Sequence, residues 1–146
     1  MNINRDLVIK RFDRLDTLLE KLREIKDVEK KKFLNDLTLQ LSAQRALVVS
    51  INICIDIGAH ILSLNKNGKP ETYSEIFENL SNLEIIDKKR KDDIIALVKF
   101  RNLLGHLYME INNEKVYEII QKDLDILTFF KKDIFSKFKN ELKNSL

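Results

Sequence analysis

The eight residues from Arg101 to Tyr108, Arg-Asn-Leu-Leu-Gly-His-Leu-Tyr, bring four chemically capable side chains into an otherwise apolar segment. Arg101 supplies a permanently charged guanidinium and Asn102 an amide. His106 supplies an imidazole and Tyr108 a phenol. A cation that binds phosphate and a titratable nitrogen that transfers protons are the groups that a metal-free enzyme needs to cleave a phosphodiester. This segment is therefore the candidate site.

Each group suits one part of that reaction. An imidazole has an ordinary pKa of roughly 6.5, so His106 is suited to take the proton from a ribose 2′-hydroxyl or to give one to the leaving oxygen. The planar fork of Arg101 is suited to hold the phosphate, and Asn102 to donate a further hydrogen bond or orient the imidazole. RNA carries its own nucleophile, and no carboxylate cluster accompanies the motif to bind a metal. Such a set of groups could cleave RNA without a metal, and DNA, which lacks the 2′-hydroxyl, should resist this chemistry.

The spacing raises a geometric problem. A straight helix turns by about 100° per residue, so Arg101 and Tyr108 would share a face while His106 points about 140° away from Arg101. Gly105 can resolve this by ending or bending the helix, since glycine is common at the C-terminal boundary of helices. Alternatively, two copies of the motif meet across a two-fold axis, which joins faces that one helix keeps apart.

Each residue also has a purely structural interpretation. An arginine and a histidine near a helix end often cap carbonyl groups or lie in solvent. Tyr108 can bury its ring and keep its hydroxyl at the surface. Because an Arg and a His five residues apart are common by chance, the spacing alone does not establish an enzyme.

The elements that must position the motif are predicted to be helices. Apolar residues recur at three- and four-residue spacing over 7–25, 33–64 and the segments that follow the breaker cluster at 66–70. Thr72 and Glu75 have the spacing of a capping box and predict a short helix from Tyr73 to Asn82. Asp87 is suited to cap a fourth helix, and Asn112 or Asn113 a fifth that continues to Phe138. We therefore predict an all-α antiparallel bundle of four to five helices.

Composition agrees with one helical domain over residues 1–146. Three Gly and one Pro leave few places for hairpin turns, and the 44% hydrophobic and 34% charged residues fit a soluble bundle. The net charge of +3 is too small to argue for nucleic-acid binding unaided. Cys54 is expected to be a buried thiol in a reducing cytoplasm. No secretory signal is visible, and polar residues interrupt the apolar run Ala46–Leu64, so we expect a core helix, no membrane span and a cytoplasmic protein.

Asp56 is the one acidic residue in the middle of that apolar run. Buried carboxylates need partners, and His60 lies one turn away. Arg101 is another partner, across the bundle or across a dimer. We expect a structural or supporting role for Asp56, and an ordinary helix position for His60.

The longer pattern resembles the HepT-type toxins of the HEPN superfamily of helical ribonucleases. The signature of these toxins is R-x4-H-x-Y with Asn after the Arg, and a later helix opens with a Val-Tyr pair. Arg101 to Tyr108 match the signature, and Val116-Tyr117 occupies the later position. The similarity covers roughly Arg45 to Ile134 and includes further segments upstream: Gln44-Arg45-Ala46, Asp56-Ile57 and Gly68-Lys69-Pro70 with Tyr73, Phe77 and Leu80.

The resemblance implies a HEPN-like domain that acts as an endoribonuclease toxin of a type VII-like toxin–antitoxin pair. In such toxins a homodimer forms a composite cleft, here with Arg101 and His106. A minimal nucleotidyltransferase antitoxin of the MntA type transfers AMP from ATP to the motif tyrosine, here Tyr108. The antitoxin uses the ATP and its metal, so the resemblance implies that this chain needs no cofactor. It also implies three partners: an RNA substrate, the antitoxin and a second copy of the chain.

Two other classes of function fit the same residues. A non-catalytic HEPN module would bind the nucleotidyltransferase and present Tyr108 as a regulated residue, because a fold survives the loss of its activity. The presence of both Arg101 and His106 argues against this alternative. A nucleotide-sensing bundle that uses Arg101 for a phosphate would bind a nucleotide without cleaving RNA.

Overall fold

The computed structural model describes residues 2–65, 69–105 and 110–143, and the described residues form eight α-helices. Six of these helices have ten or more residues, and the described residues contain no strand. The predicted all-α bundle is confirmed. The bounds are α1 Arg5–Lys26, α2 Lys30–Leu34, α3 Leu37–Ser63, α4 Tyr73–Asn82, α5 Lys88–Leu104, α6 Asn113–Lys122, α7 Leu124–Lys137 and α8 Lys139–Leu142.

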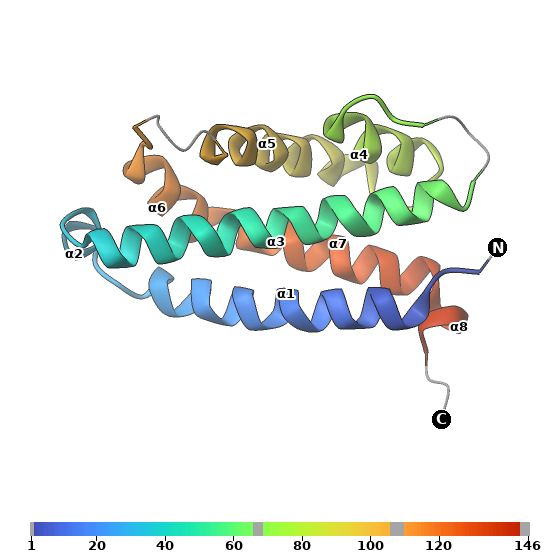
Figure 1. The fold of residues 1–146 in the computed structure, drawn as a ribbon, viewed down its shortest axis with the longest axis horizontal. Helices are drawn as coiled ribbons and strands as arrows, with labels where there is room; N and C mark the ends of the chain where they lie inside the picture. The colour runs from blue at the N-terminus through green and yellow to red at the C-terminus, as the bar shows by residue number, and fades with distance from the viewer. Residues whose placement is uncertain (1, 66–68, 106–109, 144–146) are drawn as a thin grey trace.

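Helix α3 is the centre of the bundle. It contacts α1 on one side, α4 and α5 on the other, and α7 (Figure 1). The N-terminal end of α1 lies beside the C-terminal end of α3, because the backbone N–H of Asn4 donates to Nε2 of His60 and Arg11 pairs with Asp56. The two longest helices are therefore antiparallel, as predicted. Thirteen residues of α3 are buried, Cys54 among them, so the expected buried thiol is confirmed.

Among the described residues, only α3 is long and apolar enough to cross a membrane. The most apolar window of this helix is 61% buried by the rest of the bundle. Its hydrophobicity is therefore accounted for by packing, in agreement with the expected core helix.

Side-chain caps begin most of the long helices. Asn4, Asp36 and Asn112 each accept a hydrogen bond from a backbone N–H in the first turn of their helix. Asn112, rather than Asn113, therefore caps α6. Thr72 Oγ1 accepts from Glu75 N at 3.2 Å, which confirms one half of the predicted capping box. The Glu75 carboxylate accepts from the backbone N–H of Glu71, whereas a capping box would use the N–H of Thr72, the next residue.

Helices α3 and α4 cross closely at Gly58. A Cβ at this position would lie 2.7 Å from Cγ2 of Ile76 and 3.2 Å from Cδ1 of Leu80. Both neighbours are buried and have little room to move. Glycine at position 58 therefore allows the approach that fixes α4, with Tyr73 in its first turn, against the central helix.

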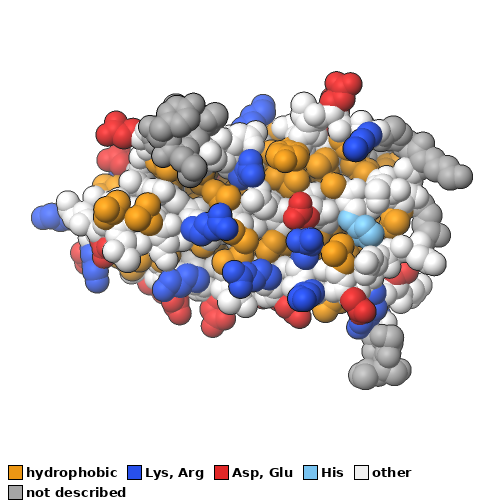
Figure 2. Space-filling view, in the orientation of Figure 1, with side chains coloured by type: hydrophobic (Ala, Val, Ile, Leu, Met, Phe, Trp, Pro, Cys, Tyr) orange, Lys and Arg blue, Asp and Glu red, His pale blue; other side chains and the backbone are white. Residues whose placement is uncertain are grey.

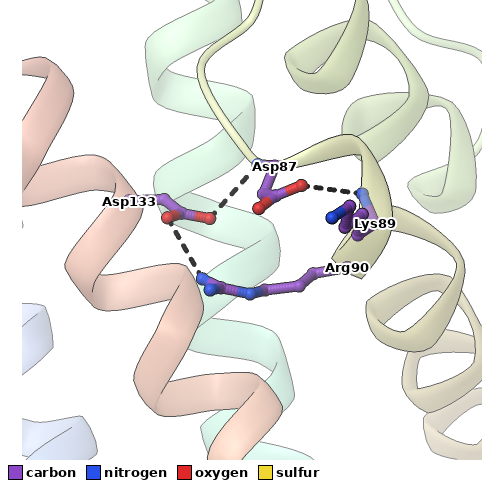
Figure 3. Close-up of polar contacts among 4 residues, drawn as sticks. All are labelled: Asp87, Lys89, Arg90 and Asp133. Atoms are coloured by element: carbon purple, nitrogen blue, oxygen red, sulfur yellow. Dashed lines mark hydrogen bonds and ion pairs between the residues drawn. The ribbon is translucent and has the colours of Figure 1, made fainter.

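The start of α5 is held on α7 by Asp133 (Figure 3). One carboxylate oxygen of Asp133 accepts from the backbone N–H of Asp87 at 3.3 Å, and the other accepts from Arg90 at 3.4 Å. The Arg90 guanidinium also lies 4.0 Å above the ring of Phe129. Asp87 caps the helix as predicted, by accepting from Lys89 N at 2.8 Å. These contacts fix the direction in which α5 carries its C-terminal residues.

Two expectations about helix number were wrong. The predicted fifth helix is divided near Asp123 into α6 and α7, because the backbone of Asp123 leaves the helical region at φ −116° and ψ 3°. The predicted helix over 33–64 is also divided, because Phe33 and Leu34 belong to the short helix α2 and α3 begins at Leu37. The apolar periodicity runs through both interruptions, since the helices on either side bury their apolar faces in the same core.

Candidate functional site

Arg101 lies in the last turn of α5 and is half-buried. The helix ends at Leu104, and Gly105 is its C-cap, with its N–H donating to the carbonyl of Arg101 at 3.1 Å. The expectation that Gly105 marks the end of the helix is therefore confirmed.

Three elements hold the Arg101 guanidinium. Nε donates to Oδ1 of Asn52 on α3 at 2.6 Å, and Nη1 donates to Oδ1 of Asn102 at 3.3 Å. The guanidinium carbon lies 5.6 Å from the ring centroid of Tyr73, the first residue of α4. A guanidinium has five N–H donors, so the two bonds orient the fork and leave donors for an anion. The arrangement suits an arginine that binds phosphate.

Asn102 is exposed and contacts Arg101 through its side-chain oxygen. This contact supports a role in orienting the guanidinium, which is a different use of the amide from the two predicted ones. The predicted hydrogen bond to the substrate or to His106 stays a prediction. His106 and Tyr108 themselves lie outside the described residues.

Asp56 differs from its expected environment. It is exposed, because it lies on the outward side of α3, one turn after Asn52. Its carboxylate pairs with Arg11 of α1 at 3.3 Å, with side-chain exposures of 54% and 40% for Asp56 and Arg11. This is a surface ion pair between two helices, not a buried carboxylate paired with His60 or with Arg101 of the same chain. His60 accepts from the backbone of Asn4, which agrees with the expected ordinary helix position.

Two residues at the site were missed by sequence reasoning. Asn52 carried a signal, since it is an amide in an apolar run at the helix that packs against α5. Tyr73 was noted only as a point of family resemblance. Its contact with Arg101 depends on how α4 and α5 pack, and no local pattern encodes that distance.

The face around Arg101 combines charge with exposed apolar groups. Figure 2 shows Lys and Arg side chains spread over the face formed by α1, α3 and α5, with hydrophobic side chains between them. Leu103 is 57% exposed and Tyr73 is 47% exposed. A groove of about 460 Å³ between α1 and α3 is lined by Lys10, Arg11 and Arg14 together with Leu7, Val49 and Ile53. Such a surface suits an anionic polymer or a protein partner.

Metal ligands do not gather in the described part of the chain. No group of three or more His, Cys, Asp or Glu side chains among residues 2–65, 69–105 and 110–143 could hold an ion.

Solved structures with the same fold define the class of protein. The chain superposes on a structure described as a tri-AMPylated Shewanella oneidensis HEPN toxin in complex with an MNT antitoxin, with a TM-score of 0.82 and 26% identity. The match covers 93% of this chain and 99% of the toxin. The cytosolic protein YutE of Bacillus subtilis has the same fold, with a TM-score of 0.83 and 20% identity. The match covers 100% of this chain and 99% of YutE. The chain is a HEPN-like helical bundle.

The sequence comparisons give the family. The chain belongs to the ribonuclease HepT-like family, whose model matches residues 15–134. It is 29% identical over 119 residues to the tRNA nuclease HepT of Aphanizomenon flos-aquae, and the aligned region covers 82% of this chain and 81% of that protein. It is 26% identical over 120 residues to the mRNA nuclease HepT of Shewanella oneidensis, and the aligned region covers 82% of this chain and 90% of that protein. The resemblance inferred from the motif is confirmed.

Proposed function

We propose that this chain is a metal-independent endoribonuclease toxin that acts as a homodimer. Arg101 and His106 act in one cleft, and AMPylation of Tyr108 by an MntA-type nucleotidyltransferase switches the cleft off. The observation that carries the proposal is the orientation of the Arg101 guanidinium by Asn52 and Asn102 at the end of α5. A preoriented cation stabilises developing phosphate charge without reorganising during the reaction.

The reaction follows from the groups available. The ribose 2′-hydroxyl attacks the adjacent phosphorus, loses its proton to a base, and forms a 2′,3′-cyclic phosphate. The bond from phosphorus to the 5′-oxygen breaks, and an acid protonates that oxygen. His106 serves one of these proton transfers, and Arg101 neutralises the additional charge on the phosphoryl oxygens. Asn102 holds the fork of Arg101.

The exposed apolar residues support a second copy as a partner. Leu103 is 57% exposed two residues after Arg101, and Val48 and Val49 of α3 stay partly exposed where they pack against the core. Large apolar side chains left exposed on a surface suit contact with another protein. A dimer through this face would bring two copies of the motif into one cleft.

The proposed control by an antitoxin has a physical basis in the same cation. An adenylyl group on Tyr108, seven residues after Arg101, brings a phosphate that Arg101 can bind. The substrate phosphate would then lose its site. The solved HEPN toxin that matches this chain is described as AMPylated and bound to its antitoxin, which supports this mode of control.

Purified wild type, Arg101→Ala and His106→Ala are incubated with transfer RNA, messenger RNA and DNA in EDTA. We expect the wild type alone to cleave RNA, to leave DNA intact and to produce cyclic phosphate ends. His60→Gln is the matched control, because His60 is the other histidine and Gln keeps an acceptor for Asn4. Light scattering measures the oligomeric state of each variant.

Full inactivity of an unmodified wild-type dimer toward every RNA would contradict the proposal. That result, together with tight binding of the nucleotidyltransferase, would favour the non-catalytic module.

A further inference from the structure

A pocket of about 580 Å³ lies between the C-terminal end of α3 and the N-terminal end of α4. Its apolar walls come from Ala59 and Leu62 of α3 and from Pro70, Tyr73 and Ile76. Its polar lining consists of Ser63, Asn65, Lys69, Glu71 and Thr72, with one cation and one carboxylate among them. Apolar walls with a few polar groups are typical of sites for small organic groups, and the volume is within their usual range.

Tyr73 connects this pocket to the candidate site. Its ring lines the pocket and lies 5.6 Å from the Arg101 guanidinium. The ring is 47% exposed, although aromatic side chains are usually well buried. The Thr72 cap and the close crossing at Gly58 fix the helix that carries it. An accessible aromatic ring on a fixed helix thus stands between a pocket and the Arg101 cation.

A nucleobase matches this combination of groups. Bases in single-stranded RNA are recognised by stacking on aromatic side chains and by hydrogen bonds to their edges. Tyr73 offers the ring, the aliphatic walls cover the flat faces of a base, and Asn65 and Thr72 offer donors and acceptors for its edge. The cation of Lys69 at the pocket suits a second phosphate of the same strand.

We propose that this pocket seats the base of an RNA nucleotide adjacent to the phosphate bound by Arg101. The inference rests on the proposed ribonuclease function and adds a base-binding subsite to it. The subsite makes Tyr73 and the pocket walls contributors to the choice of cleavage position. Cleavage then depends on a nucleotide that can leave its stack and enter the pocket, which single-stranded loops and ends permit.

The test fills the pocket without touching Arg101. Ala59 is exposed on α3, so Ala59→Phe places a ring in the pocket at little cost to folding. Ala96→Phe is the matched control, because Ala96 is an exposed alanine of α5 and does not line the pocket. Tyr73→Phe keeps the stacking ring, and Tyr73→Ala removes it. Circular dichroism and thermal unfolding verify that each variant is folded.

The probe is a short RNA with a 2′-deoxy group at the mapped cleavage position, which blocks cleavage, and 2-aminopurine beside it. Binding to the wild type should change the fluorescence of the 2-aminopurine. Ala59→Phe should raise the Kd about tenfold and abolish that change, since the base can no longer stack in the pocket. Tyr73→Ala should do the same, but it also removes a neighbour of Arg101, so Ala59→Phe is the deciding variant. Ala96→Phe should bind like the wild type, and Tyr73→Phe, which keeps the ring, should retain the fluorescence change. With cleavable RNA, Ala59→Phe should raise KM and leave kcat nearly unchanged.

The outcomes separate the two proposals. If wild type cleaves RNA and Ala59→Phe has an unchanged Kd and unchanged cleavage positions, the pocket proposal is overturned while the ribonuclease stands. If Ala59→Phe binds RNA normally but slows AMPylation of Tyr108, the pocket takes the nucleotide of the modification reaction instead, and the proposal is also overturned. If no RNA is cleaved by the wild type, the proposed function itself fails.

Discussion

Nε of Arg101 donates to Oδ1 of Asn52 at 2.6 Å, and this bond joins the end of α5 to the middle of α3. A guanidinium only donates hydrogen bonds, so the Asn52 side chain must turn its oxygen toward Arg101. The bond restricts the side-chain torsions of a long arginine before any ligand arrives. That restriction lowers the entropy lost on phosphate binding.

Under the proposed function Asn52 acts as a positioning residue, and its replacement should reduce catalysis without unfolding the protein. Asn52→Ala should lower kcat/KM for RNA by about tenfold to a hundredfold, because a hydrogen bond to a charged group contributes about 1.5–3 kcal/mol. Asn52→Asp keeps the acceptor oxygen and should restore kcat, while its added negative charge raises KM for an anionic substrate. Steady-state kinetics on the three proteins measures both constants. Equal kcat/KM for Asn52→Ala and wild type would show that Arg101 needs no such restraint.

The sequence predicted local features better than distant ones. The caps at Thr72 and Asp87 and the helix end at Gly105 follow from residues within one turn, and all three are confirmed. The Asn52–Arg101 contact joins residues 49 positions apart and depends on how α3 and α5 pack.

The same limit explains the error at Asp56. The apolar run around it indicated burial, but the side chain lies on the outward stripe of α3 with Asn52. Its partner Arg11 comes from α1, which is 45 positions away. The break at Asp123 was missed for a related reason, because α6 and α7 both face the core and keep the helical periodicity across the gap.

The groove between α1 and α3 should bind the RNA backbone through its cations. The double variant Lys10→Glu/Arg14→Glu reverses two charges that line it. We expect weaker RNA binding and a smaller salt dependence. The slope of log K against log salt should fall by roughly 0.7 for each phosphate of a single strand that the variant no longer neutralises. Binding measured at several salt concentrations gives this slope.

The control for that variant makes the same change of net charge elsewhere. Lys88→Glu/Lys89→Glu alters two exposed lysines at the start of α5, away from the groove. An equal loss of affinity in both double variants would mean that only net charge matters, and would contradict a defined RNA path.

Gly58 should be intolerant of larger side chains. Gly58→Val would place atoms against Ile76 and Leu80 in a region where a Cβ alone is already 2.7 Å from its neighbour. We expect the free energy of unfolding to fall by about 1–3 kcal/mol, the usual cost of overpacking. Urea titration measures it, and Ser63→Val on the exposed side of the same helix is the control.

A double-mutant cycle identifies the cause of that loss. Gly58→Ala and Ile76→Ala should couple, so that the double variant is more stable than the sum of the single effects. Simple additivity would show that Ile76 is not what excludes a side chain at position 58.

Cys54 should make the protein less stable at alkaline pH. Burial raises the pKa of its thiol, because the thiolate is disfavoured away from water. The folded state therefore retains a proton that the unfolded state releases above an ordinary thiol pKa of about 8.5. The stabilising contribution is complete below that pH and is lost as the pH rises, by up to about 1.4 kcal/mol per pH unit. Unfolding of wild type and Cys54→Ala is measured from pH 7 to pH 10. The difference between them should shrink above pH 8.5, and a constant difference would contradict the prediction.

Tyr108→Phe should separate toxicity from its control. The variant lacks the hydroxyl that accepts an adenylyl group but keeps Arg101 and His106, so it should cleave RNA like the wild type and resist the nucleotidyltransferase with ATP. Mass spectrometry of the treated proteins measures the modification, and growth of a bacterial host that expresses toxin and antitoxin measures its effect. Tyr117→Phe is the control, because the Tyr117 hydroxyl already donates to the carbonyl of Val28 at 2.8 Å. Neutralisation of Tyr108→Phe by a catalytically inactive antitoxin would show that binding alone suffices. Neutralisation only by an active antitoxin would place the modified residue elsewhere in the chain.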